Sequence, residues 1–127
     1  MISVEGENFE FEFRTFVERW FRLLALGQWA DSIALLDEPN NYGVRWSEAK
    51  IRKVVSEYSR GKEVEFSDPS SLTGKSRVTF GKFNDGSGYW LDCDVPLNGA
   101  RSDLTAQFEF KQRGMQYAAI LQDLHVL

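Results

Sequence analysis

Two aspartates flank the only cysteine of the chain, within the stretch Tyr89–Gly99, YWLDCDVPLNG. Carboxylates at this spacing could bind a hard cation, act as an acid–base pair, or line the solvent-exposed face of a strand. Along a strand the two side chains lie roughly 6.5–7 Å apart, so a cation would need further oxygens from a neighbouring strand. Leu91, Cys93 and Val95 share the other, apolar face of the strand, which should turn toward the core. We therefore expect Asp92 and Asp94 to face solvent, and Cys93 to be a small buried hydrophobic residue.

The other residue types that catalyse reactions are sparse. His125 is the only histidine, which argues against a Ser-His-Asp triad, a Cys-His pair and a metal site with several histidine ligands. The segment at 69–76, PSSLTGKS, ends like a phosphate-binding loop, but Pro69 stands where that loop requires its first glycine. The sequence therefore predicts no catalytic residue, no metal site and no cofactor.

Composition predicts one domain over residues 1–127. The 127 residues are 43% hydrophobic and include ten Phe and four Trp, enough to build a core. A net charge of −4, with both signs interspersed, argues against nucleic-acid binding. No apolar run approaches the ~20 residues of a membrane span, and the first residues lack the basic and apolar regions of a signal peptide. We expect a cytoplasmic protein with neither a membrane nor a nucleic-acid partner.

The first part of the chain, about residues 8–60, has helical periodicity. A short helix is expected over 29–36, and Ser47 is the expected N-cap of a third helix that ends before Gly61. An apolar stripe at spacings of three and four predicts the first helix, over about 8–26, and consists of Phe9, Phe13, Phe16, Trp20 and Leu24.

The second part, about residues 63–127, has the alternation and turns of a strand meander. Asn98-Gly99 is the strongest hairpin signal in the chain. Together the two parts predict an α+β fold, with the N-terminal helices packed on one face of a curved antiparallel sheet of about four to five strands. The expected strands cover 77–83, 89–97, 102–112 and 115–127, with a short one at 63–66.

The segment at 23–39, LLALGQWADSIALLDEP, resembles the paired helices that open the nuclear transport factor 2-like superfamily. There a long helix ends at Gly, an aromatic residue starts the next helix, and an Ala/Leu-rich turn runs into an acidic loop. The closing meander is similar too, so the resemblance spans most of the chain in layout. It implies a cone, in which the sheet wraps around the helices and the interior serves some members as a pocket. Enzymes of the superfamily place carboxylate or histidine groups inside the cone, and none of those groups can be matched here.

Period-two alternation divides the expected strands into an inward and an outward face. The inward face holds no Asp, Glu, His, Lys or Arg. One hypothesis is that the cone interior is a pocket for a small molecule, or the active site of a lyase, isomerase or hydrolase. Its polar groups and walls would then be Tyr58, Tyr89, Cys93, Phe108 and Tyr117.

The outward face alternates apolar and charged side chains, a pattern typical of protein interfaces. Our leading hypothesis is a non-catalytic domain that binds a protein partner or a second copy of itself through this face. The resemblance makes one version concrete, because small acidic members of the superfamily serve as immunity proteins that block a toxin. A register shift of one residue would instead move both aspartates inward and favour a small-molecule site. The candidate interface residues are Phe83, Trp90, Asp92, Asp94, Glu109 and Ile120.

Overall fold

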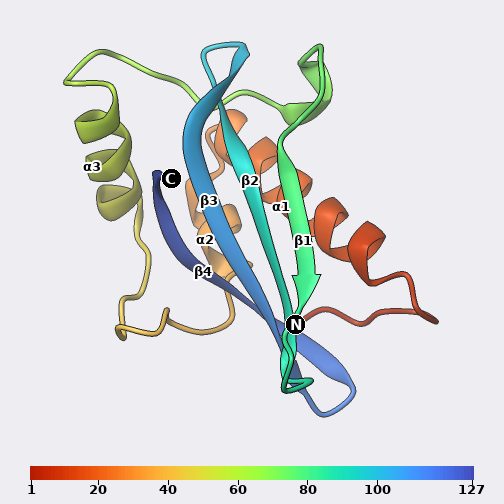
Figure 1. The fold of residues 1–127 in the computed structure, drawn as a ribbon. Helices are drawn as coiled ribbons and strands as arrows, with labels where there is room; N and C mark the ends of the chain where they lie inside the picture. The colour runs from red at the N-terminus through yellow and green to blue at the C-terminus, as the bar shows by residue number, and fades with distance from the viewer.

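The computed structural model describes residues 1–127 and contains three helices, one 3₁₀ turn and four strands (Figure 1). This order confirms the predicted α+β arrangement, in which helices precede an antiparallel meander. The helices are α1 (Phe9–Ala25), α2 (Trp29–Ala34) and α3 (Glu48–Tyr58), the 3₁₀ turn is η1 (Pro69–Ser71), and the strands are β1 (Val78–Lys82), β2 (Gly88–Leu97), β3 (Ala100–Arg113) and β4 (Gln116–Val126).

The helix ends follow from local chemistry. Glu10 and Glu12 lie in the first turn of α1 and Arg22 in its last turn, each at the end of the helix dipole that favours its charge. The hydroxyl of Ser47 accepts a hydrogen bond from the backbone N–H of Lys50, which confirms Ser47 as the N-cap of α3.

The four strands form one sheet in the order β1-β2-β3-β4, with every neighbouring pair antiparallel. Asn98 and Gly99 both have positive φ, 51° and 74°, as the predicted two-residue hairpin turn requires. The expected strand at 63–66 is reduced to one bridge, between Phe66 and Leu97. The sheet is strongly curved (Figure 1), which brings its concave face around the helices.

Aromatic rings fill the space between α1 and the concave face of the sheet. Helices α1 and α2 lie behind the sheet in Figure 1, and α3 stands beside β4. The ring of Phe13 stacks on Phe110 with the centroids 4.1 Å apart, and Trp20 meets Phe108 edge-on at 5.4 Å. All four of these side chains are fully buried. The opposite, convex face of the sheet carries no helix, and we call it the outer sheet face.

A bulge in β4 changes which residues that strand presents outward. Gln107 pairs with Asp123 while Phe108 pairs with Leu121, so one residue of β4 has no partner in between. Segment 37–46 also runs along the far edge of β4, where Asp37 exchanges hydrogen bonds with Ala119. Ile120 keeps its place opposite the outward residue Glu109, but it is only 4% exposed, so its assignment as an exposed anchor was wrong.

Candidate functional site

The five residues of the hypothetical interior pocket do not come together. Tyr58, on α3, donates a hydrogen bond to the carboxylate of Asp103 on β3, and this bond raises the pKa of Tyr58. Tyr89 and Tyr117 meet edge-on with ring centroids 6.0 Å apart, and burial raises the pKa of Tyr117. Phe108 belongs to the closed core between α1 and the sheet.

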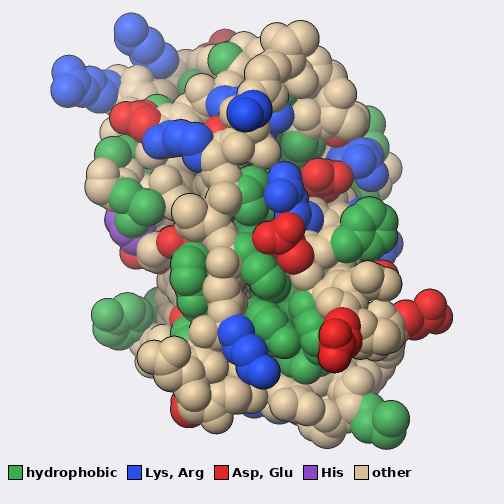
Figure 2. Space-filling view, turned by 45° about the vertical axis from the view of Figure 1, so that its right-hand side comes forward, with side chains coloured by type: hydrophobic (Ala, Val, Ile, Leu, Met, Phe, Trp, Pro, Cys, Tyr) green, Lys and Arg blue, Asp and Glu red, His purple; other side chains and the backbone are tan.

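Cys93, the fifth residue of that set, lines a different space, a cavity of about 240 Å³ between α1 and the edge of β2. We call this space the β2-edge cavity. Its apolar walls include Val17 and Phe21 of α1 and Leu91 of β2. Figure 2 brings the side with β1 and the start of α1 forward, and basic and acidic side chains gather in its upper half above hydrophobic ones. The polar and charged residues of the cavity are Arg14, Glu18, Ser70, Ser76, Asp94 and Arg101.

The cavity exists because β1 is shorter than β2. Strand β1 begins at Val78, opposite Cys93, so the part of β2 beyond this pair has no β1 residue beside it. The backbone N–H of Arg77 donates to Asp94 Oδ2 at 3.1 Å, and the N–H of Asp94 donates to the Arg77 carbonyl at 3.2 Å. Further along, Ser67 N–H donates to the Pro96 carbonyl. The side chain of Asp94 is thereby enclosed in the gap between these two contacts.

Asp94 is a buried charge, and its predicted exposure to solvent was wrong. Its side chain is 2% exposed, and its carboxylate lies 3.6 Å from Arg101 Nη1 and 4.0 Å from Arg77 Nε. Cationic partners of this kind allow a carboxylate to be buried in its charged form. Asp94 Oδ1 and Arg101 Nε nevertheless have no hydrogen-bond partner, although both atoms are buried. Unpartnered buried polar atoms are uncommon in proteins, and here two of them belong to residues that line one cavity.

Cys93 forms part of the cavity wall, and its thiol is unreactive. Only 5% of it is exposed, which confirms that it is a small buried hydrophobic residue. Burial raises the pKa of its thiol, and the negative charges of Asp94 and Asp92 raise it further. Because the thiolate is the nucleophilic form, Cys93 does not supply a nucleophile to the cavity.

The cavity holds ionisable residues beside the apolar inward face of the sheet, and three of them were not identified from the sequence. Arg14 and Glu18 lie four residues apart on α1, on either side of the buried Val17, a spacing that places both on one helix edge. That spacing was the available signal. Arg101 follows the hairpin turn, and nothing in the sequence indicates that it pairs with Asp94.

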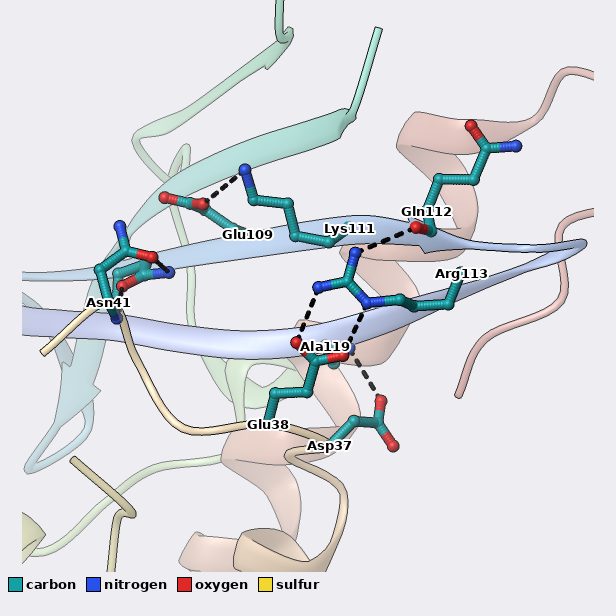
Figure 3. A network of polar contacts seen from close by, with 9 residues as sticks. Asp37, Glu38, Asn41, Glu109, Lys111, Gln112, Arg113 and Ala119 are labelled. Carbon is teal, nitrogen blue, oxygen red and sulfur yellow. Dashed lines mark hydrogen bonds and ion pairs between the residues drawn. The ribbon is translucent and has the colours of Figure 1, made fainter. Parts of the chain in front are cut away.

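On the outer sheet face, two aromatic rings are held close to the strands. Trp90 lies over Gly81, where an added Cβ would come within 2.4 Å of the indole ring. The ammonium of Lys111 lies 4.1 Å from the centroid of the Phe83 ring. Glu109 pairs with that ammonium at 3.4 Å, and Figure 3 shows the two side chains next to each other on β3. These contacts fix the orientation of both rings, so the two side chains would lose little conformational entropy when a partner binds.

Asp92 confirms the expectation of an outward carboxylate, although it is half-buried rather than fully exposed. It lies opposite Gln107 in the β2–β3 pair. Burial raises its pKa, while a hydrogen bond from Gln107 and the nearby His125 lower it. No Lys or Arg forms an ion pair with Asp92, in contrast to Asp94.

At the β4 side of the outer sheet face, segment 37–46 covers the edge of the sheet. Arg113 makes a bidentate pair with Glu38, with its Nη2 2.8 Å and its Nε 2.9 Å from the carboxylate oxygens (Figure 3). Hydrogen bonding from Arg113 lowers the pKa of Glu38. Arg113 is the last residue of β3, whereas Asn41 and Gln122 form hydrogen bonds between segment 37–46 and β4 itself.

Two other kinds of feature, a metal-binding cluster and a membrane-spanning helix, are absent from the structure. No group of three or more His, Cys, Asp or Glu residues is arranged to hold a metal ion. None of the helices combines the length and the apolar character needed to cross a bilayer.

Comparison with known proteins identifies the family of the chain. No curated protein and no solved structure matches it. A family model described as a domain of unknown function, DUF7668, matches residues 23–127, which include everything from the end of α1 to the end of β4. The chain therefore belongs to the DUF7668 family, a family of small domains whose function is unknown.

Proposed function

We propose that this domain acts without catalysis, by binding another protein through the outer sheet face. The observation that carries the proposal is the set of oriented rings, Trp90 over Gly81 and Phe83 under Lys111, on a sheet face that bears no helix. Rigid aromatic side chains flanked by charges are typical of the residues that contribute most to protein–protein affinity. Asp94 and Ile120 have no part in this surface, because both are buried.

The charge of the surface favours a partner that presents a basic side chain. Asp92 is partly desolvated and has no Lys or Arg beside it, so a cation from a partner would compensate a charge that the domain leaves unpaired. Glu109 is the second carboxylate of this face, although Lys111 already neutralises it. The net charge of −4 also attracts a basic partner.

We also propose that the fold is a nuclear transport factor 2-like cone. The order of elements and the curvature of the sheet support this relationship. Small acidic members of that superfamily act as immunity proteins, so a basic toxin is one concrete partner of the proposed kind. This version rests on an analogy of fold.

The test is a comparative capture experiment with wild-type and variant domains as baits. A protein that the wild-type bait captures from the source cells should be missing from the proteins captured by the Trp90→Ala bait and by the Asp92→Lys bait. Phe11→Ala is the matched control, because Phe11 is a 69% exposed aromatic residue on α1, and it should retain that protein. Identical captured proteins from all four baits would contradict the proposal.

Self-association is measured separately, by light scattering over a range of protein concentrations. A monomer at all concentrations agrees with a foreign partner. A dimer that Trp90→Ala dissociates would replace the foreign protein with a second copy of the chain.

A further inference from the structure

We propose that the β2-edge cavity binds a small organic monocarboxylate that carries a hydroxyl group next to the carboxylate and has an apolar body. This ligand site is separate from the outer sheet face and does not depend on the protein-binding function proposed above. Its residues come from α1, the start of β1, β2 and β3, together with the segment that contains η1.

The charges around the cavity favour one negative charge in the ligand. Arg14 and Arg101 line the cavity together with Glu18 and Asp94, and Arg77, which lies outside the lining, is a second cation beside Asp94, so with Arg77 counted one positive charge is left over. Arg14 is the free one, since it forms no ion pair within the chain. A guanidinium can hold a carboxylate by two parallel hydrogen bonds, which makes Arg14 the principal carboxylate-binding residue.

The two unpartnered buried atoms favour a hydroxyl beside that carboxylate. Arg101 Nε is a donor without an acceptor, and Asp94 Oδ1 is an acceptor without a donor. Both atoms are closed off from solvent, so the ligand reaches them only if the Arg101 side chain, which is 20% exposed, turns aside. A carboxylate oxygen can then accept from Arg101 Nε, while an adjacent hydroxyl can donate to Asp94 Oδ1. One ligand of this chemistry would give both buried atoms the hydrogen bond that they lack, since the Arg101–Asp94 ion pair, at 3.6 Å, compensates charge without forming one.

The size and walls of the cavity define the remainder of the ligand. At about 240 Å³ the cavity lies below the roughly 300–1,000 Å³ of sites for drug-sized molecules, so a ligand of about ten non-hydrogen atoms fits. Val17, Phe21 and Leu91 give it an apolar side, which suits a branched aliphatic body. Binding is non-covalent, because the thiol of Cys93 remains protonated.

The test is a titration of the full chain with 2-hydroxy-4-methylpentanoate, followed by amide resonances in NMR. We expect shifts at cavity residues such as Val78, Leu91 and Cys93. The Arg14→Gln variant should bind at least about tenfold more weakly, the effect of losing a charge-assisted contact. Arg19→Gln is the matched control, because Arg19 lies on the same helix and lines a different pocket. Its affinity should equal that of the wild type.

Two analogues test the chemistry of the ligand on the wild-type protein. We expect 4-methylpentanoate, which lacks the hydroxyl, and the neutral 2-hydroxy-4-methylpentanamide both to bind more weakly than the hydroxy acid. Equal affinity for all three compounds, equal effects of Arg14→Gln and Arg19→Gln, or no binding at millimolar concentration would each overturn the proposal. Trp90→Ala should leave the titration unchanged, so failure at this cavity and failure at the outer sheet face are distinguishable.

Discussion

Asp92 and Asp94 are two residues apart on one strand, yet they end in different environments. Asp92 lies on the outer sheet face, half-buried, with Gln107 as its hydrogen-bonding neighbour and no cation paired with it. Asp94 lies in the gap beside β2, 2% exposed and enclosed by Arg77 and Arg101. Alternation along the strand assigns both side chains to the same face, so it is the neighbouring chain segments that make the difference.

The comparison shows that the face of a strand and the cover over that face are separate properties. Next to Asp92, β1 continues the sheet through Thr79, and the face outside it remains open. Next to Asp94, β1 has ended, and Arg77 closes over the carboxylate with its backbone and its side chain. An open face suits a large partner, whereas an enclosed charge beside a cavity suits a small ligand.

The largest expected difference between the two aspartates is in stability. Asp94→Ala should lower the free energy of unfolding by about 2–3 kcal/mol, because it leaves Arg101 partly buried without its counter-charge. Asp92→Ala should change the same quantity by less than about 0.5 kcal/mol. Urea unfolding followed by tryptophan fluorescence measures both. Equal losses would show that the enclosure of Asp94 contributes nothing.

The second difference concerns access to the cavity wall. Native Cys93 should react with a thiol reagent at least about 100-fold more slowly than in the urea-unfolded chain, because it is buried and its raised pKa keeps it protonated. Asp94→Ala should accelerate the reaction and Asp92→Ala should not. The measurement is the rate of colour formation with a chromogenic disulfide. A fast reaction in the native wild type would mean that the cavity wall is open to reagents.

A smaller effect is expected where the outer sheet face is most tightly packed. Gly81→Ala places a Cβ within 2.4 Å of the Trp90 ring, which must move. Such overpacking should lower the free energy of unfolding by about 1–2 kcal/mol and weaken any binding that depends on Trp90. Thr79→Ala, two residues away on the same face, is the control and should change stability by less than about 0.5 kcal/mol. Equal effects would mean that the position of the ring is not constrained by Gly81.

The smallest effect is a pH dependence at Asp92. Burial raises its folded-state pKa above the unfolded value, so the folded protein binds this proton more readily than the unfolded chain does. The ionised form therefore destabilises the fold at neutral pH, and the penalty disappears as pH falls through the raised pKa. Asp92→Asn should be more stable than the wild type by a few tenths of a kcal/mol (~0.3) at pH 7, after allowance for solvent screening, and equal to it below the ordinary carboxyl pKa of about 3.9. Unfolding curves between those limits measure it, and an advantage that grows on acidification would contradict the assignment.

Much of the fold was predictable because its signals are local. The stripe that includes Phe13 and Trp20 defines α1, the Ser47 hydroxyl begins α3, and Asn98-Gly99 forms the predicted turn. Each of these signals depends on residues a few positions apart, and tertiary contacts reinforce rather than oppose it. The strand bounds were predicted within a few residues for the same reason.

The candidate sites were less predictable, because each miss involves a relation between distant segments. The burial of Asp94 depends on where β1 ends, and that of Ile120 on β4 lying between β3 and segment 37–46. The five residues of the hypothetical interior pocket lie apart because Tyr58 turns toward Asp103 and Phe108 is packed into the core. No pattern within a single strand carries this information.

The sequence by itself determined the class of fold, the approximate bounds of the three helices and four strands, and the face on which the residues of β2 and β3 lie, because helical and strand periodicity and turn chemistry act over short distances. Only the tertiary structure decided which of those faces is covered. It brought Arg14 of α1 and Arg101 of β3 to the cavity beside Asp94, and it left Asp92 and Trp90 on an open sheet. The physical reason is that burial and charge pairing depend on which segments meet in space, and for segments this far apart the packing of the whole chain sets that arrangement.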